Sequence, residues 1–547
     1  LDVNLYRADR PLQDAAAHNG AAGDADALSA CGSGWGAAAM AEAARLANEN
    51  APKLRTFDPR GLRRDEVEFH PAYHRLLQAS VEAGLHASTW AADGSRAAAP
   101  AEVCRAARFY MAAQVEHGHL CPVTMTRASI AALAAEPALR DRLLSRVLSR
   151  TYDPRFRPWW EKGGLTLGMG MTEKQGGSDV RANTTSAAPL DPAEARLRFG
   201  AAGEQAWRIV GHKWFFSAPQ SDAHLVLAQT SGEGSAGLSC FFVPRFLPDG
   251  SRNEIRVQRL KDKLGNRSNA SSEVEFAGAT GWLVGKVGRG VPTILEMGSH
   301  TRLDCVVGSA GIMRAALTHA LHHARGRAAF GRKLAQQPLM QNVLADLALE
   351  SEAATAFAMR LARCFDEAAD PAQALLGRIL TPAGKYWICK RGPGFGAEAM
   401  EVIGGNGYVE DSPLARLYRE FPVNSIWEGS GNVMCLDVLR AFGKAPETRD
   451  ALAAELALAG TGNAAFNGYR GKLLQDLAQP QDEYGARRLA ERLVVAVQAA
   501  LLLRHAPAFV AEAFVQSRLA HEVGGAYGRL PGGVDCEAIL ARALPVA

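Results

Sequence analysis

The sequence predicts an α+β protein of several domains, in which helical segments stand before and after a central β region. Three observations carry this prediction. Residues 1–160 show alanine-rich and helical periodicity, including 100–136 around a break at Pro122. Short runs of β-branched and aromatic residues, separated by Gly, Asp, Asn and Ser, replace this pattern over 165–285. Long helical periodicity then returns after Val291.

Composition changes along the chain predict four domains. We expect an N-terminal helical domain over 1–160, a middle β domain over 161–288, a C-terminal helical bundle over 289–442 and a helical tail over 443–547. The predicted helices of the bundle span 306–325, 338–366 and 382–403, and the tail is expected to break near 460–471 and Pro480.

Composition and charge exclude few partners but several classes of protein. A net charge of +4 over 547 residues is nearly neutral, so charge neither requires nor excludes nucleic acid. The longest apolar stretch, 493–503, is too short to cross a bilayer and contains Gln498, which predicts a buried helix and no membrane partner. Residues 1–14 lack the apolar core of a signal peptide, and because the chain begins at Leu1 rather than Met, missing leader residues are expected.

Neither the cysteines nor the histidines predict a metal site. Nine cysteines are scattered without a C-x-x-C pair, which argues against a zinc site or a disulfide framework and predicts a reducing compartment, the cytoplasm. His319, His322 and His323 share helical spacing, but the neighbouring sequence offers no acidic or thiol partner.

A glycine-rich segment in the middle region offers a cradle for a ligand. It reads Met-Gly-Met-Thr-Glu-Lys-Gln-Gly-Gly-Ser-Asp over 169–179. The glycines let backbone approach a ligand closely, while Thr172, Ser178 and exposed N–H groups can donate hydrogen bonds to an anionic or carbonyl-rich partner. Taken alone, the segment is more typical of a plain loop. The later cluster Trp-Phe-Phe-Ser at 214–217 is, by itself, typical of a sheet core.

Two further motifs stand near the end of the third region. Ile-Gly-Gly-Asn-Gly-Tyr occupies 403–408, and Ile-Trp-Glu-Gly-Ser-Gly-Asn occupies 426–432. Glu428, set between an aromatic residue and a glycine turn before a helix, is a candidate catalytic carboxylate. An acid there can equally serve the helix dipole, so this motif alone leaves both interpretations open.

The order and spacing of these motifs resemble the acyl-CoA dehydrogenase family over residues 30–442. The segments 172–179, 212–229, 261–271 and 424–439, with the extra helical tail, resemble the AidB-like branch of that family. This resemblance implies an N-terminal helical domain, a β-barrel-like middle domain and a C-terminal four-helix bundle that together hold FAD.

The resemblance also implies which residues hold the cofactor. Thr172 and Ser178 would hydrogen-bond the flavin, Phe215 would stack on it in place of the family's Trp, and Ser217 would supply a hydroxyl. The complete predicted set is Met169, Met171, Thr172, Gly177, Ser178, Phe215, Phe216, Ser217, Arg327, Phe330, Gly404, Gly405, Ile426, Trp427, Gly429, Ser430 and Asn432.

Part of this set is implied to serve a neighbouring subunit. Arg327 and Phe330 fit the family's Arg-x-x-Phe-Gly segment, which with Gly404 and Gly405 reaches the FAD of another copy. An arginine suits a pyrophosphate because its planar fork binds two oxygens. The resemblance therefore implies a homotetramer.

Glu428 falls on the family's catalytic carboxylate. It would remove the α-proton of an acyl thioester while a hydride leaves the β-carbon for flavin N5. Hydrogen bonds to the thioester oxygen would stabilise the enolate-like charge, and burial beside the flavin would raise the pKa of Glu428.

Two departures from the family pattern predict weak turnover. Glu401 replaces a Gln that contacts the neighbouring cofactor, and the Asp-x-x-Arg of the substrate helix becomes Ser-His-Thr-Arg at 299–302. One acyl-CoA contact is therefore missing, although Arg302 remains as a predicted substrate contact.

Two functions remain open from the sequence. One is a metabolic dehydrogenase that passes electrons to an electron-transfer flavoprotein. The other, implied by the AidB-like branch, is a flavoprotein that binds duplex DNA without sequence choice and protects it against alkylation. Residues 440–547 hold twelve Lys and Arg against eleven Asp and Glu, so a DNA surface requires basic residues to gather on one face; we assign it to Arg440, Lys444 and Arg518.

Overall fold

The computed structural model describes residues 2–200, 205–230, 237–520 and 525–545, and it divides into two compact units. Unit 1 combines residues 1–38, 98–115 and 302–547, and unit 2 combines 39–97 and 116–301. The N-terminal segment thus contributes to both units. The four predicted domain boundaries remain predictions.

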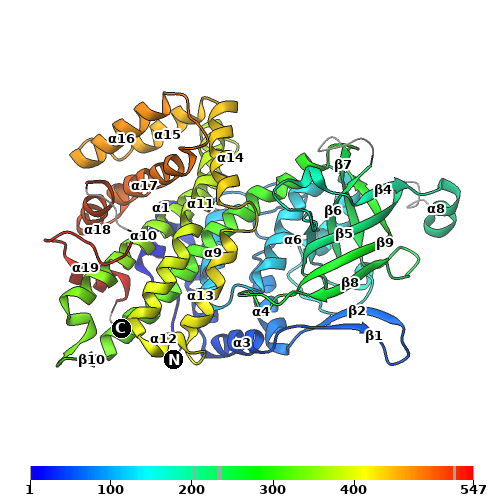
Figure 1. The fold of residues 1–547 in the computed structure, drawn as a ribbon, viewed down its shortest axis with the longest axis horizontal. Coiled ribbons are helices and arrows are strands. Elements are labelled where there is room, and N and C mark those ends of the chain that lie inside the picture. The colour runs from blue at the N-terminus through cyan, green and yellow to red at the C-terminus, as the bar shows by residue number, and fades with distance from the viewer. Residues whose placement is uncertain (1, 201–204, 231–236, 521–524, 546–547) are drawn as a thin grey trace. The chain divides into compact units, whose positions relative to one another are not determined.

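Unit 2 is built around a β-sheet with helices packed on it (Figure 1). Its strands are β1 Lys53–Phe57, β2 Arg63–Glu68, β3 Leu167–Gly170, β4 Ser186–Pro189, β5 Ala206–Ser217, β6 Ala223–Gln229, β7 Leu238–Pro244, β8 Ile255–Leu260 and β9 Ser271–Val284. Its helices are α3 Ala38–Glu49, α4 Pro71–Glu82, α6 Leu120–Leu133, α7 Pro137–Val147, η2 Trp159–Glu161, η3 Val180–Ala182, α8 Pro192–Phe199 and the start of α9 Gly290–Gly326.

The strands of the middle region close on themselves. β6 pairs with β7, β7 with β9, β9 with β5, β5 with β4, and β4 returns to β6 through Ser186 and Gln229. β3 lies parallel to β6 outside this ring, and β8 pairs with β9. Closure removes free edges, which is the physical advantage of a barrel. The barrel-like middle domain implied by the resemblance is therefore present.

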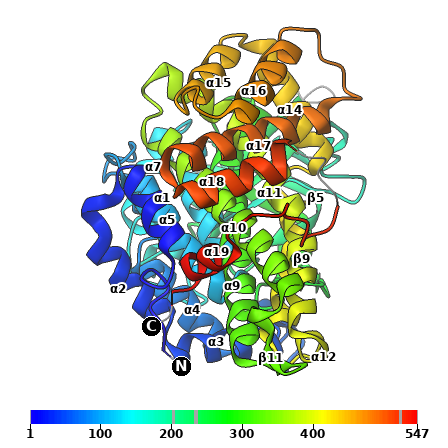
Figure 2. The same cartoon turned by 90° about the vertical axis from the view of Figure 1, so that its left-hand side faces the viewer.

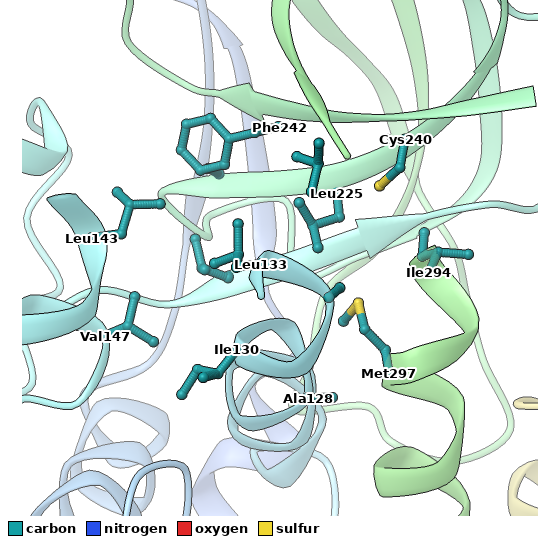
Figure 3. Close-up of a cluster of buried hydrophobic side chains, with 14 of the residues drawn as sticks. Ala128, Ile130, Leu133, Leu143, Val147, Leu225, Cys240, Phe242, Ile294 and Met297 are labelled. Atoms are coloured by element: carbon teal, nitrogen blue, oxygen red, sulfur yellow. The ribbon is translucent and has the colours of Figure 1, made fainter. Parts of the chain in front are cut away.

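Alternation along the strands separates two hydrophobic cores. Along β6, Val226 belongs to the core enclosed by the barrel, together with Phe241 and Phe276. Its neighbour Leu225 points the other way, because successive strand residues face opposite sides of a sheet. Leu225 joins the second core, formed by Phe242 of β7 and residues of α6, α7 and the start of α9, as Figure 3 shows.

The N-terminal segment of unit 2 departs from the helical prediction in one place. β1 and β2 form an antiparallel hairpin, with Lys53 opposite Glu68. The hairpin is charged and half-exposed, so it lacks the apolar alternation that would have identified it in the sequence.

Unit 1 is helical. Its elements are α1 Arg10–His18, η1 Ala21–Asp24, α2 Ala25–Trp35, α5 Ala101–Val115, the rest of α9, β10 Ala328–Ala329, β11 Arg332–Lys333, η6 Leu334–Gln336, α10 Pro338–Asp366, α11 Pro371–Ile403, α12 Gly405–Tyr408, α13 Pro413–Asn424, α14 Gly431–Lys444, α15 Thr448–Ala457, α16 Ala464–Leu477, α17 Ala486–His505, α18 Ala508–Val515, the π-helical turn η7 Gln516–Ala520 and α19 Cys536–Ala543.

Long buried helices form the centre of unit 1, and the tail packs on them. α11 contacts α10, α13 and α14, while α17 lies on α10, α11 and α14 (Figure 2). Residues 493–502 of α17 are all buried, as predicted for this apolar stretch. Within the described residues, none of the helices has the length and apolar character needed to span a membrane.

Helix starts were the least accurate part of the sequence prediction. α10 has the predicted bounds, but α11 begins at Pro371 rather than Pro382. Asp370 caps it by accepting a hydrogen bond from the Ala372 N–H at 2.8 Å, and Pro371 takes the first position, where no N–H is needed. Pro382 lies inside the helix, where burial outweighs its cost.

Two other helices also begin elsewhere than predicted. α9 starts at Gly290 instead of Val306. The break expected at Pro122 falls at 116–119, because Glu116 accepts hydrogen bonds from the N–H groups of Gly118 and His119 there. Pro122 itself lies in the first turn of α6, where its missing N–H is tolerated.

Candidate active site

The predicted cofactor residues fall into two groups, one in each unit. In unit 2 the end of β5 separates its aromatic residues by strand alternation. Phe215 is 50% exposed, whereas Phe216 is 1% exposed and stacks on His224 with ring centroids 3.8 Å apart. The assignment of Phe216 to the cofactor is therefore wrong for its side chain, which is part of the barrel core. Phe215 presents the free aromatic face that stacking requires.

Two neighbours support the Phe215 face. The Lys261 ammonium lies 4.4 Å from the centroid of the Phe215 ring, a cation–π distance, and also pairs with Glu273 at 2.8 Å. Ser217, two residues along and on the same side of the strand, is half-buried, and its Oγ lies 3.3 Å from Ser271 Oγ. Sequence reasoning did not single out Lys261, although it lies in the motif 261–271.

A buried ion pair holds the loop that follows β3. Glu173 and Lys213 lie 2.7 Å apart with fully buried side chains. Glu173 also accepts hydrogen bonds from the Thr184 N–H at 2.7 Å and from the Thr185 N–H at 3.2 Å. Although burial by itself opposes ionisation, the Lys213 charge and these donors lower the pKa of Glu173 to about 2.

The residues predicted to contact the flavin lie on this loop. The Thr172 carbonyl accepts a hydrogen bond from the Trp214 N–H at 2.8 Å, which ties the loop to β5. A Cβ at Gly177 would lie 2.6 Å from Thr172 Oγ1, so only glycine fits beside that hydroxyl. Ser178 is exposed, whereas Met169 and Met171 are half-buried against the second core.

In unit 1 the candidate base lies on a strained turn. Glu428 has φ 58°, in the left-handed region that non-glycine residues rarely occupy, and Gly429 follows with φ 104°. A Cβ at Gly429 would lie 2.4 Å from the terminal methyl of Met434, which can move aside, so it is the positive φ that makes the turn favour glycine. Strain of this kind costs about 1–3 kcal/mol and persists only where surrounding contacts enforce it.

Two cations enforce the turn. Lys385 of α11 is 1% exposed, and its Nζ donates to the carbonyl of Trp427 at 2.7 Å and to that of Gly429. These two carbonyls flank Glu428 in sequence. Sequence reasoning missed Lys385, because nothing local to a helix reveals a partner more than forty residues away.

The second cation is Arg302. Its Nε donates to the Glu428 carbonyl at 3.0 Å, and its guanidinium pairs with Asp437 at 3.0 Å. Arg302 was predicted to contact the substrate. In the structure it binds the turn that carries the candidate base, and its contact with the substrate stays a prediction.

The remaining residues of this group surround the same turn. Ile426 is 66% exposed, and the Trp427 indole donates to Asn424 at 3.1 Å. Ser430 is the N-cap residue of α14. Asn432 is exposed and accepts a hydrogen bond from Arg487 at 2.9 Å.

The residues assigned to a neighbouring subunit are on the surface of unit 1. Phe330 and Gly331 form the two-residue turn between β10 and β11 with φ of 52° and 76°, as a tight hairpin of this kind requires. Phe330 is 98% exposed. Arg327, Gly404 and Gly405 are exposed as well.

The three residues assigned to a DNA surface differ in their placement. Arg440 and Lys444 are exposed, one turn apart on α14. Arg518 is 10% exposed and bound to Asp346 and Glu350. A buried arginine with two carboxylate partners is not available to phosphate, so the assignment of Arg518 to a DNA surface is wrong.

The described residues hold no group of three or more His, Cys, Asp or Glu side chains arranged to bind a metal ion. Burial lowers the pKa of His319 to about 4. All nine cysteines are free thiols, seven of them buried.

Comparison with known proteins agrees with this geometry. Residues 1–154 match the AidB N-terminal domain of the adaptive response protein, 168–279 match the acyl-CoA dehydrogenase middle domain and 288–443 match the acyl-CoA dehydrogenase C-terminal domain. The chain therefore belongs to the acyl-CoA dehydrogenase family, in its AidB branch. Its fold and FAD-dependent oxidoreductase class follow from that membership, as predicted.

Individual relatives cover nearly the whole chain. It is 50% identical to the putative acyl-CoA dehydrogenase AidB of Escherichia coli over 517 residues, which cover 94% of this chain and 92% of the relative. The apo form of Bd2924 superposes with a TM-score of 0.82 at 30% identity, covering 92% of this chain and 98% of that one. ACDH-11 of Caenorhabditis elegans, solved in complex with C11-CoA, also gives a TM-score of 0.82, at 25% identity, covering 99% and 91%.

Proposed function

We propose that this chain is an FAD-containing flavoprotein that oxidises an acyl thioester weakly, binds duplex DNA and acts in protection of DNA against alkylation. The observation that carries the enzymatic part is the Glu428 turn, held in a left-handed conformation by Lys385 and Arg302. Family membership supports a reaction at a CH–CH bond, and the C11-CoA complex of the nematode relative supports an acyl-CoA as substrate class.

The residues present fit the cofactor. The exposed Phe215 face, the Ser217 hydroxyl, and Thr172 with Ser178 on the glycine loop would hold the flavin from unit 2. When bound, FAD supplies the acceptor for the hydride that leaves the β-carbon.

Glu428 then removes the α-proton of the acyl thioester. An α-proton is weakly acidic, so the developing negative charge on the thioester oxygen must be stabilised by donors, of which the Glu428 N–H is one. The strained turn would present both the side chain and the backbone N–H of Glu428 to the same acyl thioester. Lys385 and Arg302 hold that turn through its backbone carbonyls.

Weak turnover follows from the commitment of Arg302 to the turn and from Ser299 in place of an acidic substrate contact. The role of Glu428 as the base can be tested by isotope exchange. FAD-loaded protein is incubated with an acyl-CoA in D₂O, and α-deuteration is followed by mass spectrometry. We expect exchange with the wild type and a loss of about 100-fold or more in Glu428→Gln. Undiminished exchange in that variant would remove Glu428 from the role.

We also propose that the chain acts as a homotetramer. The fully exposed Phe330 at a rigid hairpin tip, beside exposed Arg327, supports a contact with a second copy. Phe330→Ser should shift the mass measured by light scattering towards smaller species. An unchanged tetramer would place the interface elsewhere.

The DNA-binding part rests on Arg440 and Lys444. Both are exposed on one face of α14, and no acidic side chain among the described residues forms an ion pair with either of them. Such charges bind phosphates by counterion release, so affinity falls as salt rises. Arg440→Glu with Lys444→Glu should lower affinity for a duplex of any sequence and reduce the salt slope by about 2.

The matched control is Arg208→Glu, an exposed arginine on β5. If the double variant and this control lose affinity equally, or if neither loses any, α14 does not bind DNA. The alternative function is then a metabolic acyl-CoA dehydrogenase of the cytoplasm, with no DNA role, that delivers electrons to an electron-transfer flavoprotein. Its intact Glu428 turn favours it equally.

A further inference from the structure

Lys385 carries a buried positive charge that no carboxylate of the described residues neutralises. Its side chain on α11 is 1% exposed, and its Nζ donates hydrogen bonds to the carbonyls of Trp427 and Gly429. No Asp or Glu side chain in the described part of the chain forms an ion pair with it. Buried charges are normally paired, because taking an ion out of water is costly. The unpaired ammonium therefore indicates a task that needs positive charge at this place.

Holding the turn does not by itself need a charge. The start of the same turn is tied to α11 by a neutral donor, since Ser425 Oγ donates to the Cys389 carbonyl at 2.9 Å. A serine or amide side chain could satisfy a carbonyl in the same way without burying an ion. What Lys385 adds to such a contact is its charge.

The carbonyl that Lys385 binds belongs to the same peptide group as the N–H of Glu428. This peptide is trans, so its C=O and N–H bonds are coplanar and point in opposite directions. Lys385 Nζ lies 2.7 Å from the Trp427 oxygen. It is therefore on the opposite side of the peptide from any group that the Glu428 N–H binds, and it can influence such a group without touching it.

A cation at a peptide oxygen strengthens the N–H at the other end of the peptide. The nitrogen lone pair is shared with the carbonyl, which gives the C–N bond its partial double-bond character. Positive charge at the oxygen increases this shift of electrons and leaves the N–H hydrogen more positive. Hydrogen bonds that follow one another polarise each other in this way. The Glu428 N–H is therefore a stronger donor than an ordinary peptide N–H.

The following peptide has a cation as well, but a compensated one. Arg302 Nε donates to the Glu428 carbonyl at 3.0 Å, and this carbonyl shares its peptide with the N–H of Gly429. The Arg302 guanidinium also pairs with Asp437 at 3.0 Å, and Arg378 pairs with the same carboxylate at 2.7 Å. Asp437 thus offsets part of the arginine charge. Within the described residues, Lys385 is the cation at the turn that has no such offset.

We propose that Lys385 is a positioning residue that strengthens the Glu428 N–H as a donor to the oxygen of the acyl thioester; this inference rests on the proposed function. When the Glu428 carboxylate takes the α-proton, the electron pair of the C–H bond shifts towards the carbonyl, and negative charge develops on its oxygen. Polarisation of the peptide and direct attraction by the ammonium both stabilise that charge. The oxygen of the intact thioester is nearly neutral and gains less, so the effect favours proton removal over substrate binding.

The test compares a neutral ligand with one that carries the charge. FAD-saturated protein is titrated with a saturated acyl-CoA and with a 3-oxoacyl-CoA of the same chain length, whose acidic α-proton lets it bind as an enolate that absorbance detects. In Lys385→Met we expect enolate affinity to fall at least about tenfold, because a hydrogen bond with a charged partner is about twice as strong as a neutral one. Affinity for the saturated acyl-CoA should fall less than about threefold.

Two further variants separate charge from mechanical support. Ser425→Ala removes a neutral hydrogen bond of the same turn and should change the two affinities by the same factor. Asp437→Asn removes the offset from Arg302, so it should raise the ratio of enolate to saturated affinity by about threefold or more. This opposite change keeps the proposal testable if Lys385→Met does not fold.

The outcomes distinguish this inference from the function on which it rests. Equal losses of both affinities in Lys385→Met, or a ratio that Asp437→Asn leaves unchanged, would mean that Lys385 only holds the turn. Such a result would overturn the inference and leave the dehydrogenase assignment in place. Failure of the wild type to bind either thioester would overturn the proposed substrate class, and this inference with it.

Discussion

Replacing Glu173 by Gln should loosen the flavin loop and destabilise unit 2. Glu173 is 1% exposed, pairs with the fully buried Lys213 and accepts hydrogen bonds from Thr184 and Thr185. The native state favours the charged form of Glu173, whose pKa falls to about 2, whereas burial lowers the pKa of Lys213 to about 8 and offsets part of that gain. The expected loss therefore follows from leaving one partner alone: breaking a buried ion pair by removing one partner costs about 3–5 kcal/mol.

The sign of the pH dependence follows from the lowered pKa. Stability from Glu173 is present above the unfolded value of 4.5 and is lost as pH falls from about 5 towards about 2. Calorimetric unfolding at saturating FAD should show a melting temperature about 6–12 °C lower in Glu173→Gln at pH 7. The gap between variant and wild type should close as the pH is lowered.

The control is Glu254→Gln, which breaks the exposed pair with Arg256 and should change stability by less than about 1 kcal/mol. Adding Lys213→Met to Glu173→Gln should recover part of the loss, because no unpaired charge stays buried. If Glu173→Gln melts within 2 °C of wild type, roughly the shift of a minor surface change, or if its deficit at pH 3 is as large as at pH 7, the ion pair does not stabilise the loop.

Three other changes separate neighbouring roles. Lys385→Met should lower the rate of substrate α-proton exchange about tenfold or more, because it frees the carbonyls beside Glu428, and should change acyl-CoA affinity less. Equal losses of exchange rate and affinity would mean that Lys385 has only a structural role. Phe215→Ala should weaken FAD binding, measured by fluorescence titration, and leave stability unchanged, whereas Phe216→Ala should cost about 3–5 kcal/mol of stability. The reverse pattern would mean that Phe216, and not Phe215, contacts the flavin. Arg518→Gln should destabilise unit 1 by about 3–5 kcal/mol without changing the salt slope of DNA binding. A changed salt slope would mean that Arg518 contacts DNA.

The sequence was most informative where local chemistry decides structure. Turn residues marked the strands of the barrel, and Pro338 marked the start of α10, whose bounds were predicted correctly. Motif order predicted the family, and the place of Glu428 in that order, rather than its local sequence, made it the candidate base. Strand alternation alone could have separated Phe215 from Phe216.

Features that depend on distant partners could not be predicted. Lys385 and Trp427 meet across 42 residues, and Arg518 and Asp346 across 172. From sequence alone, a lysine in a helix and an arginine in a nearly neutral tail are expected to be solvated charges. A cavity of unit 1 lined by Gln498 likewise exists only because six separate elements meet there.

The central claim is that the strained turn at Glu428 carries the base of an FAD-dependent dehydrogenation. The most direct measurement is the anaerobic absorbance of FAD-loaded wild type and Glu428→Gln, mixed with a panel of acyl-CoAs of different chain length. We expect at least one acyl-CoA to bleach the flavin of the wild type, and the flavin of Glu428→Gln to stay oxidised on the same timescale. Equal bleaching in both proteins, or a wild-type flavin that every thioester leaves oxidised, would contradict it.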